Sequence, residues 1–314
     1  MQYYFAPLEG LTDSIYRRLH HKYFPGIDRY YTPFFSPTMH RTLTPRECRE
    51  LPPANELNFV VVPQILTKNP EDFLWMAQKC AEQGYQEVNL NLGCPSGTVT
   101  AKGKGSGMLA DTDGLDAFLY HVFSKNPVDV SVKTRIGFHS PEEFPKLLEI
   151  FNRYPIKELT IHPRVRDAFY KGNVDMLSYE YAQAHSRAPL CYNGNLCTCK
   201  DVIRFERTYP DTAAVMIGRG LIADPGLFAK GGTTRELLEN FYAELLDAYL
   251  EAFGGSRNAM FRLKENWRYL ICKFDNADKL YKQLRKTTSL AEYKTITAEI
   301  FRNLPIKQDV TPDW

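Results

Sequence analysis

The chain has 314 residues, of which 44% are hydrophobic and 24% are charged, and its formal net charge at pH 7 is +2. This composition is that of an ordinary folded protein and excludes a disordered chain. Apolar runs fall short of the ~20 residues of a membrane span, and the opening MQYYFAPLEG lacks the basic leader and apolar segment of a signal peptide. We therefore expect a cytoplasmic protein without membrane association.

The seven cysteines are odd in number and irregularly spaced, which does not indicate a disulfide framework and suits a reducing compartment. Cys191, Cys197 and Cys199 are close in sequence, but they lack the paired C-x-x-C spacing of a zinc site. No metal ion is predicted.

In chain order, short segments rich in β-branched and aromatic residues alternate with segments of helical periodicity. The candidate strands are Tyr3–Ala6, Arg29–Thr32, Asn58–Gln64, Glu87–Leu92, Val128–Thr134, Glu158–His162, Leu190–Asn193 and Ala214–Ile217. The candidate helices are Glu71–Gln83, Gly114–Ser124, Pro141–Asn152, Met176–His185 and Cys199–Tyr209. Eight strands with intervening helices predict a parallel TIM (β/α)8 barrel over residues 1–232.

Polar or charged residues stand at the carboxyl ends of seven of these strands. In order, the ends offer Pro7-Leu8-Glu9, Gln64, Asn91 with Cys94, Lys133 with Arg135, His162, Asn193-Gly194-Asn195 and Gly218-Arg219. Any one of them could be structural, but enzymes of this fold carry their active sites at this end of the barrel. The recurrence along the chain therefore predicts a catalytic site.

The most informative segment is Glu87–Met108, EVNLNLGCPSGTVTAKGKGSGM. Cys94 follows a strand at a turn set by Gly93 and Pro95, ahead of a glycine-rich loop that contains Lys102. A lone cysteine is more often a small buried hydrophobe, but this polar, turn-rich setting favours a reactive thiol. Because an unperturbed thiol has a pKa of about 8.5, it is mostly protonated at neutral pH and can donate a proton.

Two glycine turns follow the last two strands, at Asn193–Asn195 and Gly218–Gly220. Phosphate groups often bind in this fold at the loops after strands seven and eight, where glycines let backbone N–H groups approach the ligand. The turns therefore predict a phosphate-bearing cofactor. FMN suits better than a dinucleotide, because no G-x-G-x-x-G unit follows the first strand.

Residues 233–314 have no convincing strands, and capping signals predict a bundle of about four helices. Residues 256–307 hold 12 Lys and Arg against 5 Asp and Glu, a net charge of +7, whereas residues 1–255 carry −3. This asymmetry indicates a polyanionic partner, although a solvated basic surface is the alternative. We expect the bundle's aromatic residues to form mostly its core: Trp267, Tyr269, Phe274, Tyr281 and Tyr293.

The motif N-L-G-C-P-S and its glycine-rich loop resemble the active-site segment of the tRNA-dihydrouridine synthases. The likeness extends to APLEGLTD at Ala6–Asp13, SVKTR around Lys133, TIHPR around His162 and K-x-x-W-x-Y-L at Lys264–Leu270, and so covers most of the chain. The resemblance implies that the protein reduces the 5,6 double bond of specific uridines in tRNA. The reductant would be FMN, itself reduced by NADPH or NADH. A hydride would pass from flavin N5 to uracil C6, and a proton from Cys94 to C5.

The resemblance also implies roles for individual residues. Flavin contacts would come from Pro7, Leu8, Glu9, Gln64, Lys133, His162, Asn193, Gly194, Asn195, Gly218 and Arg219. The uracil and the tRNA would be held by Asn91, Lys102, Arg135, Arg164, Arg166, Arg262, Lys264 and Arg268. The triplet Pro163-Arg164-Val165 departs from the family's pattern and leaves the roles of Arg164 and Arg166 open.

Two other functions compete with this interpretation. One is an FMN-dependent barrel oxidoreductase that acts on a free pyrimidine or enone, which would have no need of a basic tail. The other is a non-catalytic RNA-binding protein with a vestigial flavin site. We expect a monomer whose partner is tRNA.

Overall fold

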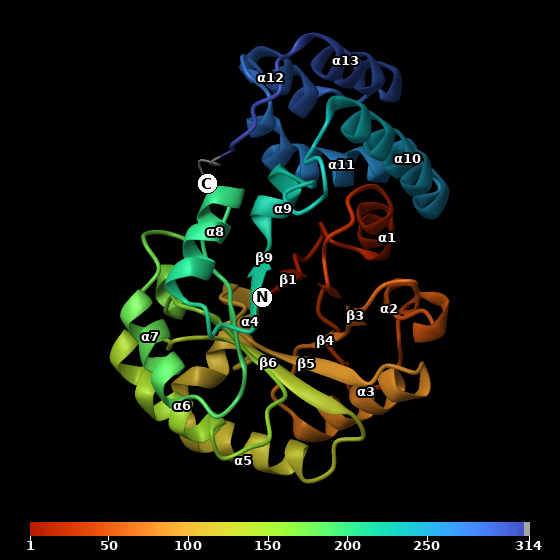
Figure 1. Ribbon diagram of the computed structural model, residues 1–314. Helices are drawn as coiled ribbons and strands as arrows, with labels where there is room; N and C mark the ends of the chain where they lie inside the picture. Colours follow the sequence, from red (N-terminus) through yellow and green to blue (C-terminus); the bar gives the residue numbers. More distant parts are fainter. Residues whose placement is uncertain (311–314) are drawn as a thin grey trace. The chain divides into compact units, whose positions relative to one another are not determined.

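The computed structural model describes residues 1–310 and contains nine short strands in one sheet. Neighbouring strands pair in parallel. The strands, visible as arrows in Figure 1, are β1 (Gln2–Phe5), β2 (Arg29–Tyr31), β3 (Val61–Val62), β4 (Gln64–Ile65), β5 (Glu87–Leu92), β6 (Asp129–Arg135), β7 (Leu159–His162), β8 (Leu190–Tyr192) and β9 (Ala214–Ile217).

The sheet closes on itself through a strand that Pro63 divides. The strand order is β3-β2-β1-β9-β8-β7-β6-β5-β4, so the two ends of the sheet are β3 and β4, which only Pro63 separates. Proline has no N–H for the ladder, yet its carbonyl still accepts from Asn89 N at 2.8 Å. Counted as one, β3 and β4 form the third of eight barrel strands, and the predicted (β/α)8 fold is confirmed.

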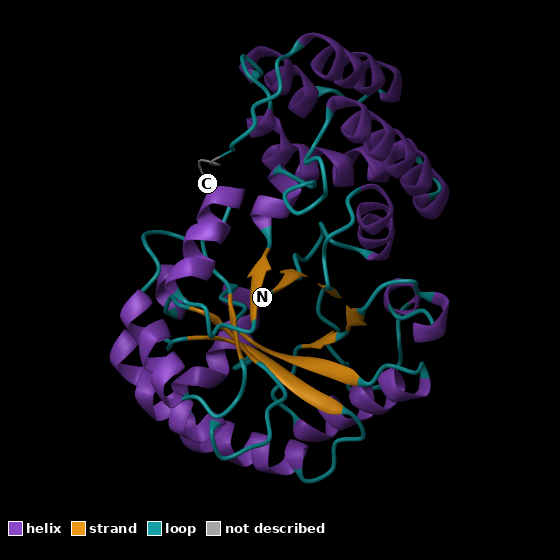
Figure 2. Ribbon diagram, viewed as in Figure 1, coloured by secondary structure: helices purple, strands orange, loops and turns teal. Residues whose placement is uncertain are grey.

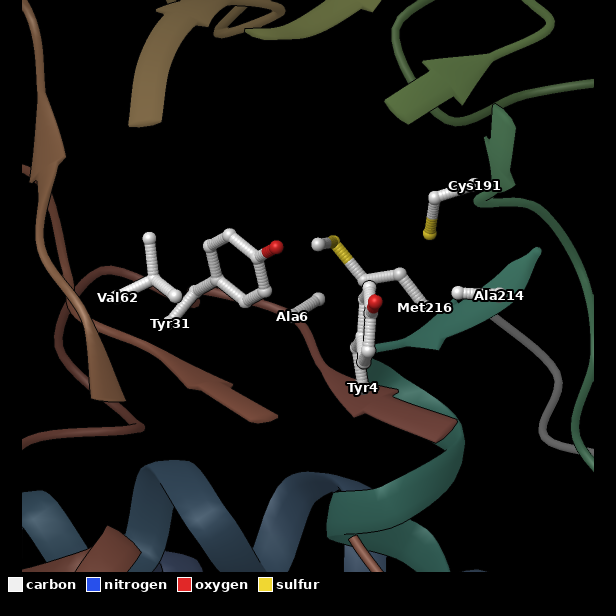
Figure 3. Close-up of a cluster of buried hydrophobic side chains, with 7 residues drawn as sticks. All are labelled: Tyr4, Ala6, Tyr31, Val62, Cys191, Ala214 and Met216. Carbon is white, nitrogen blue, oxygen red and sulfur yellow. The ribbon is translucent and has the colours of Figure 1, made fainter. Parts of the chain in front are cut away.

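The interior of the barrel contains both a hydrophobic cluster and polar side chains. Figure 3 shows seven buried side chains, from β1, β2, β3, β8 and β9 and from the residue after β1, that form one cluster: Tyr4, Ala6, Tyr31, Val62, Cys191, Ala214 and Met216. On the other side, Lys133 Nζ of β6 reaches Asn193 Oδ1 just after β8, across the intervening β7. Lys133 therefore points inward, and so does Asn91, its register partner on β5. All six residues of β5 are buried, so the intervening leucines face the surrounding helices.

By its internal contacts the described chain divides into two compact units. The first comprises residues 1–7, 28–195 and 209–216, and its helices lie outside the strands (Figure 2). They are α2 (Pro45–Glu50), α3 (Pro70–Glu82), α4 (Gly97–Thr100), α5 (Thr112–Phe123), α6 (Phe144–Phe151) and α7 (Met176–His185). Asn69, Asp111 and Asp175 begin three of them by accepting hydrogen bonds from first-turn N–H groups.

The second unit comprises residues 8–27, 196–208 and the chain from Ile217 onward. Its helices are α1 (Ser14–Tyr23), α8 (Cys199–Thr208), α9 (Arg219–Ala223), α10 (Arg235–Phe253), α11 (Ser256–Leu270), α12 (Asp278–Lys286) and α13 (Leu290–Asn303). The division into a barrel of residues 1–232 and a tail of residues 233–314 stays a prediction.

The core of the second unit is aromatic: Trp267, Phe274 and Tyr293 are buried as expected, whereas Tyr269 and Tyr281 are only partly buried. Trp267 is fully buried, donates from Nε1 to the hydroxyl of Tyr293 at 2.9 Å, and packs its ring 5.3 Å from those of Tyr242 and Phe301. Within residues 1–310, no helix combines the length and the apolar character that a membrane crossing requires.

Candidate active site

Cys94 sits on a turn whose backbone is fixed on both sides. The side chain of Asn91 accepts hydrogen bonds from the backbone N–H groups of Gly93 and Cys94, at 3.0 and 2.9 Å. The carbonyl of Cys94 in turn accepts from the Ser106 hydroxyl at 2.8 Å and from its backbone N–H at 3.2 Å. The thiol is partly exposed and belongs to no disulfide. The hydrogen bonds thus fix the backbone from which the thiol projects.

The loop that follows Cys94 packs back against it at Gly105. Its φ of +58° suits glycine, and a Cβ there would lie 2.9 Å from the carbonyl oxygen and 3.1 Å from the Cβ of Cys94. Gly105→Ala should therefore lower the free energy of unfolding by about 1–3 kcal/mol and displace the thiol. Urea unfolding measures the first effect, and the alkylation rate of Cys94 measures the second.

Gly97 provides the matched control for this prediction. It is the first residue of α4, in the same connection between β5 and α5, but a Cβ there would meet nothing within 4 Å and its φ is not positive. Gly97→Ala should leave both stability and thiol reactivity close to those of the parent protein. Equal effects of the two substitutions would contradict the role given to Gly105.

Buried amides form a directional chain across the strands beneath the turn. Asn91 Nδ2 donates to Gln64 Oε1 at 2.7 Å, and Gln64 Nε2 donates to Asn89 Oδ1 at 2.8 Å. Asn89 Nδ2 then donates to the Ser131 hydroxyl at 3.0 Å. Because each oxygen and nitrogen has an assigned partner, Asn91 and Gln64 are held in single orientations. The sequence indicated Gln64 and Asn91 but not Asn89 or Ser131, which lie within β5 and β6 and not at their carboxyl ends.

Lys133 lies inside the barrel with its ammonium 2.6 Å from Asn193 Oδ1, and Asn193 Nδ2 donates to the carbonyl of Met216 at 2.6 Å. Burial is the main cause that lowers the pKa of Lys133 to about 8, and the positive charge of Arg135 adds to it. A buried lysine whose pKa is lowered in this way is typical of a functional site rather than of a surface ion pair.

Arg135 is almost fully buried and bridges two loops. Its Nε donates to the carbonyl of Gly93 and its Nη1 to the carbonyl of Val165, both at 2.9 Å. Its guanidinium also lies 5.3 Å from the ring centroid of Tyr170. Burial lowers its pKa to about 10, so it stays charged at neutral pH. The resemblance implied a substrate contact for Arg135, and these bonds give it a positioning role as well.

The structure supplies a role for Arg164 that the sequence left open. Its Nη1 lies 2.8 Å from His162 Nε2, and its Nη2 donates to the carbonyl of Gly172 at 2.7 Å. A guanidinium can only donate, so Nε2 of His162 accepts and the imidazole is neutral with its proton on Nδ1. Arg166 instead donates to the Thr100 hydroxyl at 3.0 Å, which joins the loop after β7 to the Cys94 loop.

The barrel unit thus brings one group of predicted residues together at the strand ends: Gln64, Asn91, Cys94, Lys133, Arg135, His162 and Asn193. Pro7, Gly194, Asn195, Lys102, Arg164 and Arg166 lie in loops of the same unit, and Lys102 is exposed. The other predicted residues belong to the second unit: Leu8, Glu9, Gly218, Arg219, Arg262, Lys264 and Arg268.

Within the second unit, the three predicted RNA contacts differ in their surroundings. Arg262 Nη1 donates to the carbonyl of Gly10, and Lys264 Nζ donates to the carbonyl of Thr287. Arg268 is exposed, with its guanidinium 5.9 Å from the ring centroid of Tyr269. Gly218 caps the start of α9, and Arg219 is the first residue of that helix.

Comparison with known proteins places these observations in context. Residues 4–303 match the family model described as dihydrouridine synthase (Dus). A probable tRNA-dihydrouridine synthase 1 of Synechocystis sp. is 28% identical over 308 residues, which cover 93% of this chain and 84% of that protein. A tRNA-dihydrouridine synthase B of Pasteurella multocida is 27% identical over 226 residues, which cover 72% of this chain and 67% of that protein.

Solved structures show a similar fold at low sequence identity. A morphinone reductase variant in complex with tetrahydroNAD superposes with a TM-score of 0.51 and 11% identity, over 77% of this chain and 86% of that one. A variant of NCR from Zymomonas mobilis gives a TM-score of 0.50 and 12% identity, with the same coverage.

Proposed function

The chain belongs to the dihydrouridine synthase family, and from that premise we propose that it reduces uridine in tRNA to dihydrouridine. The observation that carries the proposal is the Cys94 turn. Its thiol is partly exposed, and the backbone of Cys94 is held by hydrogen bonds to Asn91 and Ser106. The relatives named tRNA-dihydrouridine synthase, one of them aligned over 93% of the chain, support the same substrate.

The residues present fit FMN as the cofactor. The barrel end offers an ammonium at Lys133, a neutral imidazole at His162 and fixed amides at Gln64 and Asn193, which are suitable donors for a polar ring system. Gly194 lets the turn after β8 pack against Tyr192, because a Cβ there would lie 2.9 Å from Tyr192 Oη. When bound, FMN would supply the hydride for uracil C6 after reduction by NADPH or NADH.

The protein's own residues would then supply the proton and the orientation. Cys94 would donate its Sγ–H proton to C5 as the 5,6 double bond becomes single, leaving a thiolate that solvent reprotonates. Asn91 Nδ2 has two hydrogens, one of which goes to Gln64; we propose that the other holds a uracil carbonyl. Lys133 would stabilise negative charge in the water-poor barrel mouth.

The tRNA would be held mainly through its phosphates. The proposed contacts are Lys102 and Arg166 in the barrel loops, with Arg262, Lys264 and Arg268 in the basic helical region. Arg164, predicted as a further contact, is buried and bonded to His162 and Gly172, so we propose that it positions His162 instead. The target base must leave its stack, which costs a few kcal/mol, and phosphate contacts can offset that cost. Arg219 and the turn at Asn193–Asn195 are each proposed to contact the cofactor's phosphate.

The test of this proposal uses unmodified tRNA transcripts. The purified protein, supplied with FMN and NADPH, should convert at least one uridine to dihydrouridine, seen as a 2 Da mass gain by nuclease mapping (one hydride plus one proton). tRNA from a strain that lacks the protein should lose dihydrouridine at the same position. If neither the transcript nor the cellular tRNA changes, the proposed activity is wrong.

A further inference from the structure

A cavity of about 1160 Å³ lies between α11 and α12 of the second unit. Arg257, Phe261, Lys264 and Arg268 line it from α11, and Tyr281 and Arg285 line it from α12. The α11 residues follow one another at intervals of four, three and four, which places them on one face of the helix. The opposite face carries the buried residues of the aromatic core, including Trp267.

This cavity is strongly cationic. Four of its lining residues carry positive charge, and Glu265 is its one acidic residue among those described. Lys264 has a structural task, because its ammonium donates to the carbonyl of Thr287 near the end of α12 and so ties that helix to α11. Burial lowers its pKa. Arg257, Arg268 and Arg285 are exposed and present their guanidinium groups to solvent at the cavity.

An aromatic side chain stands among these arginines. Phe261 is 64% exposed and lines the cavity beside Arg257, Lys264 and Arg268, so its ring is accessible to a ligand there. Tyr281 stands across the cavity on α12, with the Arg285 guanidinium 5.7 Å from its ring centroid. A surface that only attracted the phosphates of a duplex would need neither the hollow nor the exposed ring.

We propose that this cavity captures one unstacked nucleotide of the tRNA, with its base against Phe261 and its phosphate on the arginines. The inference rests on the proposed function, since it takes tRNA as the partner. Every base has an aromatic face that can stack on a phenyl ring, and guanidinium groups bind phosphate through paired N–H donors. The volume accommodates a nucleotide with part of the flanking backbone.

The occupant is therefore a nucleotide from a loop or bulge of the tRNA, and not one from a stem. Bases in an RNA helix are stacked and paired, so a pocket can take a base only where the chain is single-stranded. A site of this kind fixes the register of the bound tRNA, because one defined nucleotide must enter it.

The experiment compares tRNA binding by the wild-type protein and three full-length variants, measured by fluorescence anisotropy across a salt series. Phe261→Ala should weaken binding roughly tenfold without changing the slope against salt, because stacking releases no counterions. Arg285→Ala should lower that slope by about one. Lys282→Ala is its matched control: it removes one charge from the same helix outside the cavity and should do less. Thermal melting confirms folding, which truncation of exposed side chains should preserve.

Three outcomes separate the possibilities. A loss with Phe261→Ala at constant salt slope, together with an ultraviolet crosslink from the cavity to an unpaired nucleotide, supports the capture site. If Phe261→Ala binds like the wild type, or Arg285→Ala and Lys282→Ala are equivalent, the inference is overturned while dihydrouridine formation persists. If the wild-type protein neither binds nor modifies tRNA, the proposed function fails and this inference with it.

Discussion

The Cys94→Ala protein is expected to bind flavin and to accept electrons from NADPH at the wild-type rate, yet to form dihydrouridine about 10²–10⁴-fold more slowly. That range is the usual contribution of a positioned proton donor. The loss should be confined to the step that needs the proton, because the hydrogen bonds to Asn91 and Ser106 that hold the turn come from the backbone of residue 94. Rapid-reaction absorbance separates flavin reduction from its reoxidation by tRNA.

Two controls sharpen this result. Cys94→Ser keeps the shape but offers a much weaker acid, so it should also be slow. Cys48→Ala changes an exposed cysteine on α2 and should be silent. Wild-type turnover by Cys94→Ala would show that the proton comes from another group and would remove the thiol from the mechanism.

The Lys133→Met protein is expected to be more stable and less active. At neutral pH the folded protein holds the lysine charged in a site that lowers its pKa from 10.5 to about 8. That difference corresponds to about 3 kcal/mol of destabilisation, from which the lost hydrogen bond to Asn193 subtracts about 1 kcal/mol. The variant should therefore gain about 2 kcal/mol in free energy of unfolding. Dihydrouridine formation should fall about 10²-fold, the typical cost of removing one preorganised charge.

The stability difference between Lys133→Met and the wild type should depend on pH. A depressed lysine pKa means that the unfolded chain binds more protons between pH 8 and 10.5, so wild-type stability rises over that interval. The advantage of Lys133→Met should be full below pH 8 and fade toward pH 10.5. Denaturant unfolding of flavin-free protein measures it. Lys146→Met, on an exposed position of α6, should show no such trend; a pH-independent difference at Lys133 would contradict the burial argument.

The barrel was predictable from sequence because short strand segments alternate along the chain with segments of helical periodicity. The predicted segment Glu87–Leu92 coincides with β5, and the other strands lie within a few residues of their predicted bounds. The third strand was predicted as continuous, but Pro63 divides it, since no N–H is available there. The helix α1 was not predicted, although Asp13 accepts from Tyr16 N as its cap, because its apolar residues are few.

The site was predictable in its residue types and less so in their contacts. Strand ends of a parallel barrel meet at one edge, so Gln64, Asn91 and Lys133 could be grouped from sequence alone. The bond of Arg164 to His162 and that of Ser106 to Cys94 depend on how loops fold back, which has no periodic signal. Likewise, the composition indicated the basic helix but not the cavity beside it. The cavity depends on how α12 packs against α11, which composition does not reveal.

The bridge made by Arg135 has a consequence for how this enzyme can diversify. One planar guanidinium spans the carbonyls of Gly93 and Val165, so the loops after β5 and β7 share a fixed separation. A lysine has no such fork and could not replace it. An insertion or a grafted sequence in either loop would have to preserve that spacing, or bring a compensating change in the other. We therefore expect these two loops to change together in evolution. An engineer who wishes to alter substrate choice should exchange them as a pair.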